Sequence, residues 1–218
     1  MSLSFYTADT PNGLKVSIYL QEARLPHKQV TVDLAAGEQH QPGYRKINPN
    51  GKIPAIVDHD ARMTVFESGA ILTYLSAKTG CLQPARYADQ VRIQQWLHFQ
   101  VGGIGPMLGQ LWWFRHGSRT DNREAIDRYH REALRLYDVV DRRLGESEFI
   151  ATSAYSIADI AAYSWLRTWE ELDLDIMPYV HVQRWLDDIN QRPAVRRAIA
   201  ANGKPMPEQP APADARKA

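Results

Sequence analysis

The chain has 218 residues, of which 44% are hydrophobic, enough for one large or two small domains with a buried core. Its 26 lysines and arginines against 25 aspartates and glutamates give a net charge of +1, which gives no reason to expect nucleic acid as a partner. The N-terminus lacks a signal-peptide pattern, no segment approaches about 18 uninterrupted apolar residues, and the single cysteine cannot form an internal disulfide, which together predict a cytoplasmic protein without membrane contact.

The first third of the sequence alternates predicted strands and helices. Short apolar runs indicate strands, and apolar residues spaced four and three apart, such as Val16, Leu20 and Ala23, indicate a helix. In chain order we expect a strand at 3–6, a helix at 13–23, a strand at 28–33, a helical turn at 44–47, strands at 55–58 and 63–66, and a helix at 67–79. This βαβαββα order is that of a thioredoxin-like α/β domain, which carries its ligand sites at loop and helix ends.

The rest of the sequence predicts an all-α, helical C-terminal domain. Gly80 is a helix stop and Pro84 a helix breaker, so residues 81–86 are interpreted as a linker between a first domain at 1–80 and a second at 87–202. Helices are expected at 87–115, 120–144, 157–171, 178–191 and 193–200.

Two further features mark the ends of these segments. Ser156 is followed three positions later by Asp159, which is a helix-capping signature with a role in folding. Residues 203–218 combine several prolines with charged and small residues, a composition that predicts a flexible tail.

The run from Asn48 to Pro54 is the most informative part of the first domain. Pro54 directly precedes an apolar strand, and only a bond before proline makes the cis form accessible, at about 0.5–1 kcal/mol, so Ile53–Pro54 is a candidate cis bond. A cis bond there would turn the backbone of Ile53 outward, where it could pair with an extended peptide ligand.

Glu67 and Ser68 open the next predicted helix. Unpaired backbone N–H groups and the positive end of the helix dipole favour a ligand carboxylate there, and the side chain of Glu67 can bind an ammonium group. Together with Ile53 and Pro54, they predict a ligand with an extended backbone, a free carboxylate and an amine beside it. A γ-glutamyl tripeptide fits this description.

These motifs resemble the soluble glutathione transferase family, whose first domain carries the Asn-Pro-x-Gly-Lys-[Val/Ile]-Pro run and the later Glu-Ser. Residues 6–15 look like the Thr-Pro-Asn-Gly-x-Lys loop of the nu class of bacterial glutathione transferases, and residues 96–110 and 155–161 are similar to that class as well. The resemblance covers nearly the whole chain. It implies the glutathione transferase fold, a homodimer and glutathione-dependent disulfide-bond reduction.

The chemistry depends on how the glutathione sulfur becomes a thiolate, because a thiol with a pKa near 8.5 supplies little thiolate at neutral pH. Thr10 and Asn12 lie at the start of the first helix, where a hydroxyl, an amide and backbone N–H groups can donate to a thiolate and lower its pKa. The resemblance implies that Thr10 and Asn12 are the catalytic residues. An ordinary helix-capping turn and activation by Tyr6, near the end of the first strand, stay open as alternatives.

The first loop holds no cysteine, and Cys81 is expected to be a packed side chain rather than a nucleophile. The electrons for disulfide reduction must then come from glutathione. We therefore expect a site that holds one or two glutathione molecules, as the reduced co-substrate or as the disulfide, beside a small disulfide, peroxide or electrophile.

Other binding residues are weaker predictions. Gln39 and Lys52 are candidates for the glycine carboxylate of glutathione, and the resemblance implies Arg128 for a second glutathione, although Arg128 shares its helix with other arginines of a solvated face. The aromatic run Trp112–Phe114 is either a wall of an acceptor pocket or core. The histidines show no metal-site spacing, so no metal is expected.

Two other functions remain open. The first is conjugation of glutathione to small electrophiles, which uses the same thiolate but requires an apolar acceptor site. The second is a non-catalytic glutathione-binding regulatory protein, because a related domain in a fungal nitrogen regulator keeps the fold. Retention of Thr10, Asn12, Glu67 and Ser68 favours catalysis.

Overall fold

A computed structural model describes residues 2–202, so the predicted tail at 203–218 lies outside the described residues. Four strands form one mixed sheet in the order β2-β1-β3-β4. They are β1 (Leu3–Thr7), β2 (Lys28–Thr31), β3 (Ala55–Asp58) and β4 (Met63–Phe66). Strand β1 is parallel to β2 and antiparallel to β3, with Phe5 opposite both Gln29 and Ile56.

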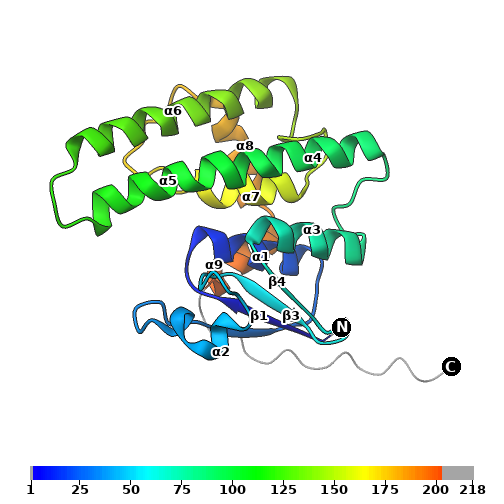
Figure 1. Ribbon diagram of the computed structural model, residues 1–218. Coiled ribbons are helices and arrows are strands. Elements are labelled where there is room, and N and C mark those ends of the chain that lie inside the picture. The colour runs from blue at the N-terminus through cyan, green and yellow to red at the C-terminus, as the bar shows by residue number, and fades with distance from the viewer. Residues whose placement is uncertain (1, 203–218) are drawn as a thin grey trace.

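The helices of this half are α1 (Pro11–Glu22), α2 (Pro42–Arg45) and α3 (Ser68–Thr79), with a 3₁₀ turn η1 (Glu38–His40) that the sequence did not predict. Helices α1 and α3 lie between the sheet and the helical half of the molecule, whereas α2 lies away from that half (Figure 1). The residues of α1 from Gly13 to Leu20 are all buried, because this helix is covered on several sides. The thioredoxin-like arrangement predicted from the sequence is confirmed.

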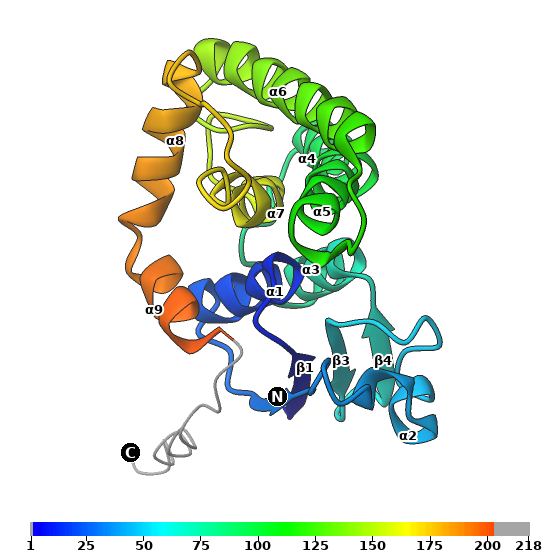
Figure 2. The same ribbon diagram turned by 90° about the vertical axis from the view of Figure 1, so that its left-hand side faces the viewer.

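The second half is helical. Its elements are α4 (Tyr87–Phe99), the π-helical turn η2 (Gln100–Ile104), α5 (Gly105–Trp112), a second π-helical turn η3 (Trp113–Gly117), α6 (Arg123–Glu146), α7 (Ile157–Leu166), α8 (Val180–Asn190) and α9 (Pro193–Ala201). Figure 2 shows α7 enclosed by α4, α5, α6 and α8, with α9 placed beside α1.

Two predicted helices differ from the structure. The single helix expected at 87–115 is divided by η2, where Gly102 and Gly103 leave the backbone weakly constrained and Pro106 cannot donate the N–H of a regular α-helix. The helix expected at 157–171 ends at Leu166, and turns follow it. Among residues 2–202, none of the helices is both long and apolar enough to cross a lipid bilayer.

The predicted cap of α7 is confirmed and is buried. Ser156 Oγ accepts from the backbone N–H of Ala158, and Asp159 accepts from the backbone N–H groups of Ser156 and Ile150 and from Nε1 of Trp185. Burial raises the pKa of Asp159 to about 6, and these donors oppose that shift. The cap therefore ties α7 to the loop before it and to α8.

The last helix returns to the first one and holds its two ends. Arg192 forms an ion pair with Glu22 at 2.7 Å, at the end of α1. Asn202, just after α9, donates from Nδ2 to Oδ1 of Asp9 at 2.8 Å, in the loop before α1. Helix α9 thus fixes the position of the loop that carries Thr10.

Candidate functional site

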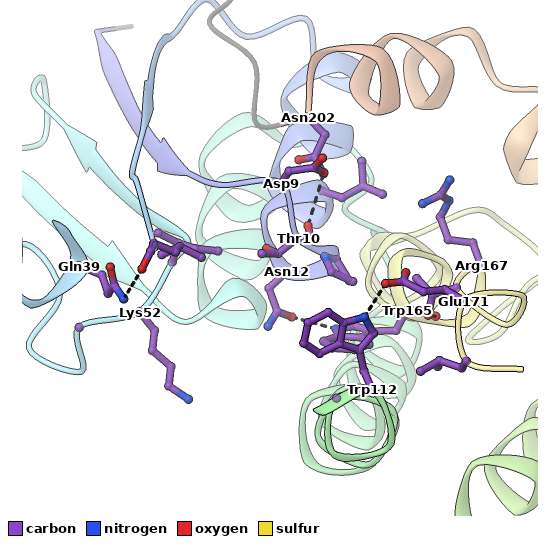
Figure 3. A pocket seen from close by; sticks show the side chains of 18 of the residues that line it. Asp9, Thr10, Asn12, Gln39, Lys52, Trp112, Trp165, Arg167, Glu171 and Asn202 are labelled. Carbon is purple, nitrogen blue, oxygen red and sulfur yellow. Dashed lines mark hydrogen bonds between the residues drawn. The ribbon is translucent and has the colours of Figure 1, made fainter. Parts of the chain in front are cut away.

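A cavity of about 710 Å³ lies between the two halves of the molecule. Figure 3 shows Thr10 and Asn12 on one side and Trp112, Trp165 and Glu171 on the other. We call the part formed by residues 9–53 the first wall, and the part formed by residues 109–172 the second wall. Their lining residues are Asp9, Thr10, Pro11, Asn12, Leu14, Leu34, Gln39, His40, Gly51, Lys52 and Ile53, and Gly109, Trp112, Trp165, Arg167, Thr168, Glu171 and Leu172, with Asn202 at the margin.

The first wall begins with the loop that caps α1. Thr10 is the N-cap residue, and its Oγ1 accepts from the backbone N–H of Gly13 at 3.1 Å. A Cβ at Gly13 would lie 2.3 Å from Oγ1 of Thr7 and 2.6 Å from the carbonyl oxygen of Ala8, so the loop closes this tightly only with glycine there. Because Thr10 Oγ1 already accepts one bond, its own proton remains available for another acceptor.

Asn12 is held by a residue of the other wall. Trp165 Nε1 donates to Asn12 Oδ1 at 2.9 Å, and an indole N–H can only donate, so the amide oxygen of Asn12 must face the indole. The amide NH₂ group of Asn12 is thereby left to donate to a ligand. The indole fits because α5 carries glycines beside it: a Cβ at Gly105 or Gly109 would lie 3.3 Å or 3.2 Å from ring atoms of Trp165.

In the segment predicted to be a peptide cradle, side chains hold the backbone at Lys52 in place. The carbonyl oxygen of Lys52 accepts from the hydroxyl of Tyr44 at 2.7 Å and from Nδ2 of Asn48 at 2.6 Å. The Ile53–Pro54 bond is cis, as predicted, and Lys52 and Ile53 both line the cavity. Pro54 itself is buried behind them.

Gln39 is also a lining residue. Its Nε2 donates to the carbonyl oxygen of Leu34 at 3.3 Å, while its Oε1 is buried and has no hydrogen-bond partner within residues 2–202. A buried polar atom of this kind is satisfied when a polar ligand binds beside it. The wall therefore suits a ligand with peptide groups, such as glutathione.

Glu67 and Ser68 lie at the start of α3, beyond the lining of the cavity. Glu67 is exposed and has a positive φ of 68°, and Ser68 is buried. Lys15 Nζ donates to Ser68 Oγ at 3.1 Å, so the Ser68 hydroxyl, like that of Thr10, accepts one hydrogen bond and keeps its own proton for another group. Burial lowers the pKa of Lys15 to about 7 although the charge of Glu67 opposes this shift. Burial of Lys15 was not predicted from the sequence.

Four other candidate residues, Tyr6, Trp113, Phe114 and Arg128, lie outside the cavity lining. Arg128 is exposed on α6, so its role in binding a second glutathione stays a prediction. Tyr6 packs its ring edge-on against Tyr44 with centroids 6.0 Å apart, which agrees with a packing role. Of the aromatic run, Trp112 lines the cavity, whereas Trp113 is 48% exposed and Phe114 stacks on Tyr129.

The second wall contains functional candidates that sequence analysis missed. Trp165, Arg167 and Glu171 come from α7 and the turns after it, and Trp112 Nε1 donates to Oε1 of Glu171. One signal was present in the sequence: Gly105 and Gly109 are spaced four apart on a helix, which favours close approach by a bulky group. It did not indicate which group approaches.

No cluster of three or more histidine, cysteine, aspartate or glutamate side chains suited to a metal ion occurs within the described part of the chain. Cys81 is half-buried, and burial raises the pKa of its thiol. Among the residues that line the cavity, Thr10 and Asn12 offer hydrogen-bond donors and none is a cysteine.

Comparison with protein families agrees with this geometry. The pattern of the glutathione S-transferase N-terminal domain matches residues 1–77, and that of the glutathione S-transferase C-terminal domain matches residues 104–193. The disulfide-bond oxidoreductase YfcG of Escherichia coli is 42% identical over 90% of this chain and 94% of its own length. The disulfide-bond oxidoreductase YghU of the same organism is 36% identical over 95% of this chain and 78% of its own.

Solved structures give the same result. A glutathione transferase from Pseudomonas putida with one glutathione disulfide bound per subunit has a TM-score of 0.86 and 38% identity, covering 91% of this chain and 90% of that one. A glutathione transferase from Burkholderia graminis with two glutathione molecules bound per subunit has a TM-score of 0.86 and 40% identity, covering 92% and 88%.

Proposed function

The chain belongs to the glutathione S-transferase family, and on that premise we propose that it is a glutathione-dependent disulfide-bond reductase. The observation that carries the proposal is the bond from Trp165 to Asn12 Oδ1, which leaves the amide NH₂ of Asn12 to donate at the start of α1. A site built from such donors suits an anionic sulfur. Relatives named as disulfide-bond oxidoreductases support the choice of reaction.

In this proposal Thr10 and Asn12 stabilise the thiolate of glutathione. The Thr10 hydroxyl and the Asn12 amide each have their acceptor atom occupied, by Gly13 and Trp165, so both present protons to the sulfur. The N-terminus of α1 adds its partial positive charge. Hydrogen bonds to the charged form lower the pKa of the thiol and raise the fraction of thiolate at neutral pH.

Bound glutathione supplies the electrons: two glutathione thiols become one glutathione disulfide while the substrate disulfide becomes two thiols. The first wall and the start of α3 together bind and orient the tripeptide. Ile53 pairs with its backbone beside Pro54, Gln39 and Lys52 hold the glycine end, and Glu67 and Ser68 hold the γ-glutamyl end. Structures of relatives with one glutathione disulfide or two glutathiones per subunit support a cavity that holds both halves.

We further propose that the protein is a cytoplasmic nu-class homodimer, in which Arg128 serves a second glutathione in its own subunit or in the partner. Large apolar side chains are exposed on α4 and β4, with Tyr87 77% and Met63 47% exposed, which suits an interface with a second copy. Light scattering of the purified chain tests the dimer.

Conjugation of glutathione to electrophiles is the second candidate, because the aromatic side chains of Trp112 and Trp165 offer an apolar surface to an acceptor. This reaction uses the same thiolate. The two functions therefore differ in their preferred acceptor and not in the first wall.

The test is steady-state reduction of 2-hydroxyethyl disulfide by glutathione beside conjugation of chlorodinitrobenzene, for the wild type, Thr10→Ala and Tyr6→Phe. We expect disulfide reduction to dominate, to fall strongly in Thr10→Ala and to persist in Tyr6→Phe. Dominant conjugation, or loss of activity with Tyr6→Phe alone, would contradict the proposal. Glutathione binding without turnover would instead indicate a regulatory protein.

A further inference from the structure

Lys15 is buried directly behind the first wall. Its side chain lies on α1, only 1% of the residue is exposed, and its Nζ donates to Ser68 Oγ at 3.1 Å and to Gln100 Oε1 at 2.7 Å. Ser68 begins α3 and Gln100 begins the π-helical turn η2. One ammonium group thus joins the first helix, the start of the helix proposed to bind the γ-glutamyl end, and the helical domain.

The hydrogen-bond partners of the Lys15 ammonium group are neutral, whereas the Lys78 ammonium group has a carboxylate partner. Lys78 pairs with the buried carboxylate of Asp58, which also accepts from Tyr74, and this pairing lowers the pKa of Asp58 to about 2. The hydrogen bonds of Lys15 Nζ go instead to a hydroxyl and to an amide oxygen. Removing an ammonium from water costs several kcal/mol, and neutral acceptors offset this only in part. Stability alone does not account for a lysine here.

The hydrogen-bond roles at Ser68 follow from the ammonium group. An ammonium has protons to donate and no lone pair, so Ser68 Oγ must accept from Lys15 and its own proton is left for a third group. Thr10 and Asn12 share this arrangement, because Gly13 and Trp165 occupy their acceptor atoms. All three groups are prepared to donate to an anion.

We propose that Lys15 is a positioning residue for glutathione, whose buried ammonium orients the Ser68 hydroxyl toward the carboxylate of the γ-glutamyl end and places a positive charge behind that carboxylate. The inference rests on the proposed function, since it assigns a further residue to the same site. The carboxylate supplies the negative charge that the neutral partners Ser68 and Gln100 do not.

The electrostatics of Lys15 agree with this role. Burial lowers its pKa to about 7, and Glu67 at the start of α3 is the charged group whose field raises it. A second negative charge near Ser68 raises the pKa of Lys15 further. Binding then draws a proton onto Lys15 at pH values slightly above 7.

The test is calorimetric binding of S-methylglutathione, which has no thiol to ionise, to the full chain and to Lys15→Met. We expect Lys15→Met to raise the Kd about ten-fold or more, as when a hydrogen bond to a charged group is weakened. Its Tm should be unchanged or higher, because an apolar side chain replaces a buried charge. Titrations at pH 8 in buffers of different ionisation enthalpy should show proton uptake in the wild type and little in Lys15→Met.

Two variants separate positioning from packing. Lys78→Met leaves Asp58 buried without its partner, so its Tm should fall while the Kd stays within about two-fold of the wild type. In a Ser68→Ala background, Lys15→Met should raise the Kd by a clearly smaller factor than in the wild type, because part of its effect on binding passes through Ser68. Equal affinity of wild type and Lys15→Met, or a fall in Tm without loss of proton uptake, would overturn the inference.

Gln100→Glu provides an independent test should Lys15→Met fail to fold. It gives Lys15 a carboxylate partner in place of the amide oxygen, and it should weaken binding several-fold while the Tm holds or rises. Unchanged affinity in Gln100→Glu would contradict the inference. Failure of the proposed function is distinguishable, because a wild type that binds S-methylglutathione without catalysing disulfide reduction contradicts that function and not the assignment of Lys15, whereas a wild type that does not bind it contradicts both.

Discussion

The two walls of the cavity are built in different ways. The first wall consists of a helix cap and a backbone turn, and residues close in sequence hold each other in place there, as Thr10 holds Gly13 and Asn48 holds Lys52. The second wall consists of side chains such as Trp112 from α5, α7 and the turns after α7, which meet only in the tertiary structure. We therefore expect the first wall to recognise glutathione in every reaction, and the second wall to determine which acceptors bind.

The largest expected effect comes from Asn12 of the first wall. Asn12→Ala should lower kcat about 100-fold with every disulfide acceptor, the range expected when a donor to a developing or stabilised anion is removed. Asn12→Asp should be at least as severe, because a carboxylate still accepts from Trp165 but offers no proton to the thiolate. Steady-state rates with a small and a large disulfide measure both variants.

An Asn12→Asp enzyme with nearly wild-type activity would contradict the role of Asn12 as a donor to the thiolate, and with it the distinction between the walls. Asn12→Ser is the matched control, since it shortens the side chain and keeps one donor. Its rate should lie between those of the wild type and Asn12→Ala.

Trp165 joins the two walls and gives the next largest effect. Trp165→Phe keeps an aromatic ring beside Gly109 but loses the N–H that fixes Asn12, so kcat should fall about ten-fold, as expected for loss of one buried hydrogen bond. The pKa of bound glutathione should rise, which ultraviolet absorbance of the thiolate records. Trp112→Phe is the control, because the N–H of Trp112 is bonded to Glu171 instead; an equal shift in both variants would contradict the assignment.

The second wall should show effects that depend on the acceptor. Trp112→Ala removes an aromatic surface from the cavity, so KM for an aromatic disulfide should rise about three- to ten-fold, in line with about 0.5–1.5 kcal/mol for an aromatic contact. KM for glutathione should not change. Trp113→Ala, on the exposed side chain outside the lining, is the control, and a uniform loss with all acceptors would show that the walls are not separable.

The smallest effect concerns stability and pH. The pKa of Lys15 is lowered to about 7, so above pH 7 the unfolded chain holds a proton that the folded chain has released, and stability rises with pH by up to about 1.4 kcal/mol per unit from this group. Glu67 is the charged group whose field opposes this shift. Lys15→Met should remove the rise between pH 7 and 9 in thermal unfolding. An identical pH slope in both proteins would show that Lys15 keeps its ordinary pKa.

Much of the fold was predictable because its signals are local. The strands Ala55–Asp58 and Met63–Phe66 and the cap at Ser156 are marked by runs and residue types within a few positions of one another. The two π-helical turns were not predicted, because each spans only five residues, too few to show a periodicity of its own within a longer helical pattern. The early end of α7 at Leu166 was missed for a similar reason, since apolar residues continue beyond it.

The site residues divide in the same way, into those with a local sequence signal and those without one. Thr10, Asn12, Gln39, Lys52 and Ile53 were chosen from short motifs and line one cavity. The sequence by itself determined the family and the first wall, because a capped helix and a proline-containing turn specify their own backbone.

Only the tertiary structure showed that Trp165, 153 positions from Asn12, orients the amide of Asn12. It also showed that Lys15 on α1 is buried away from water. Orientation and burial depend on which helices pack together, and no pair of distant residues carries a local signal for that. The physical reason is that hydrogen-bond roles and pKa shifts are set by neighbours in space, whereas the motifs of a sequence record neighbours along the chain.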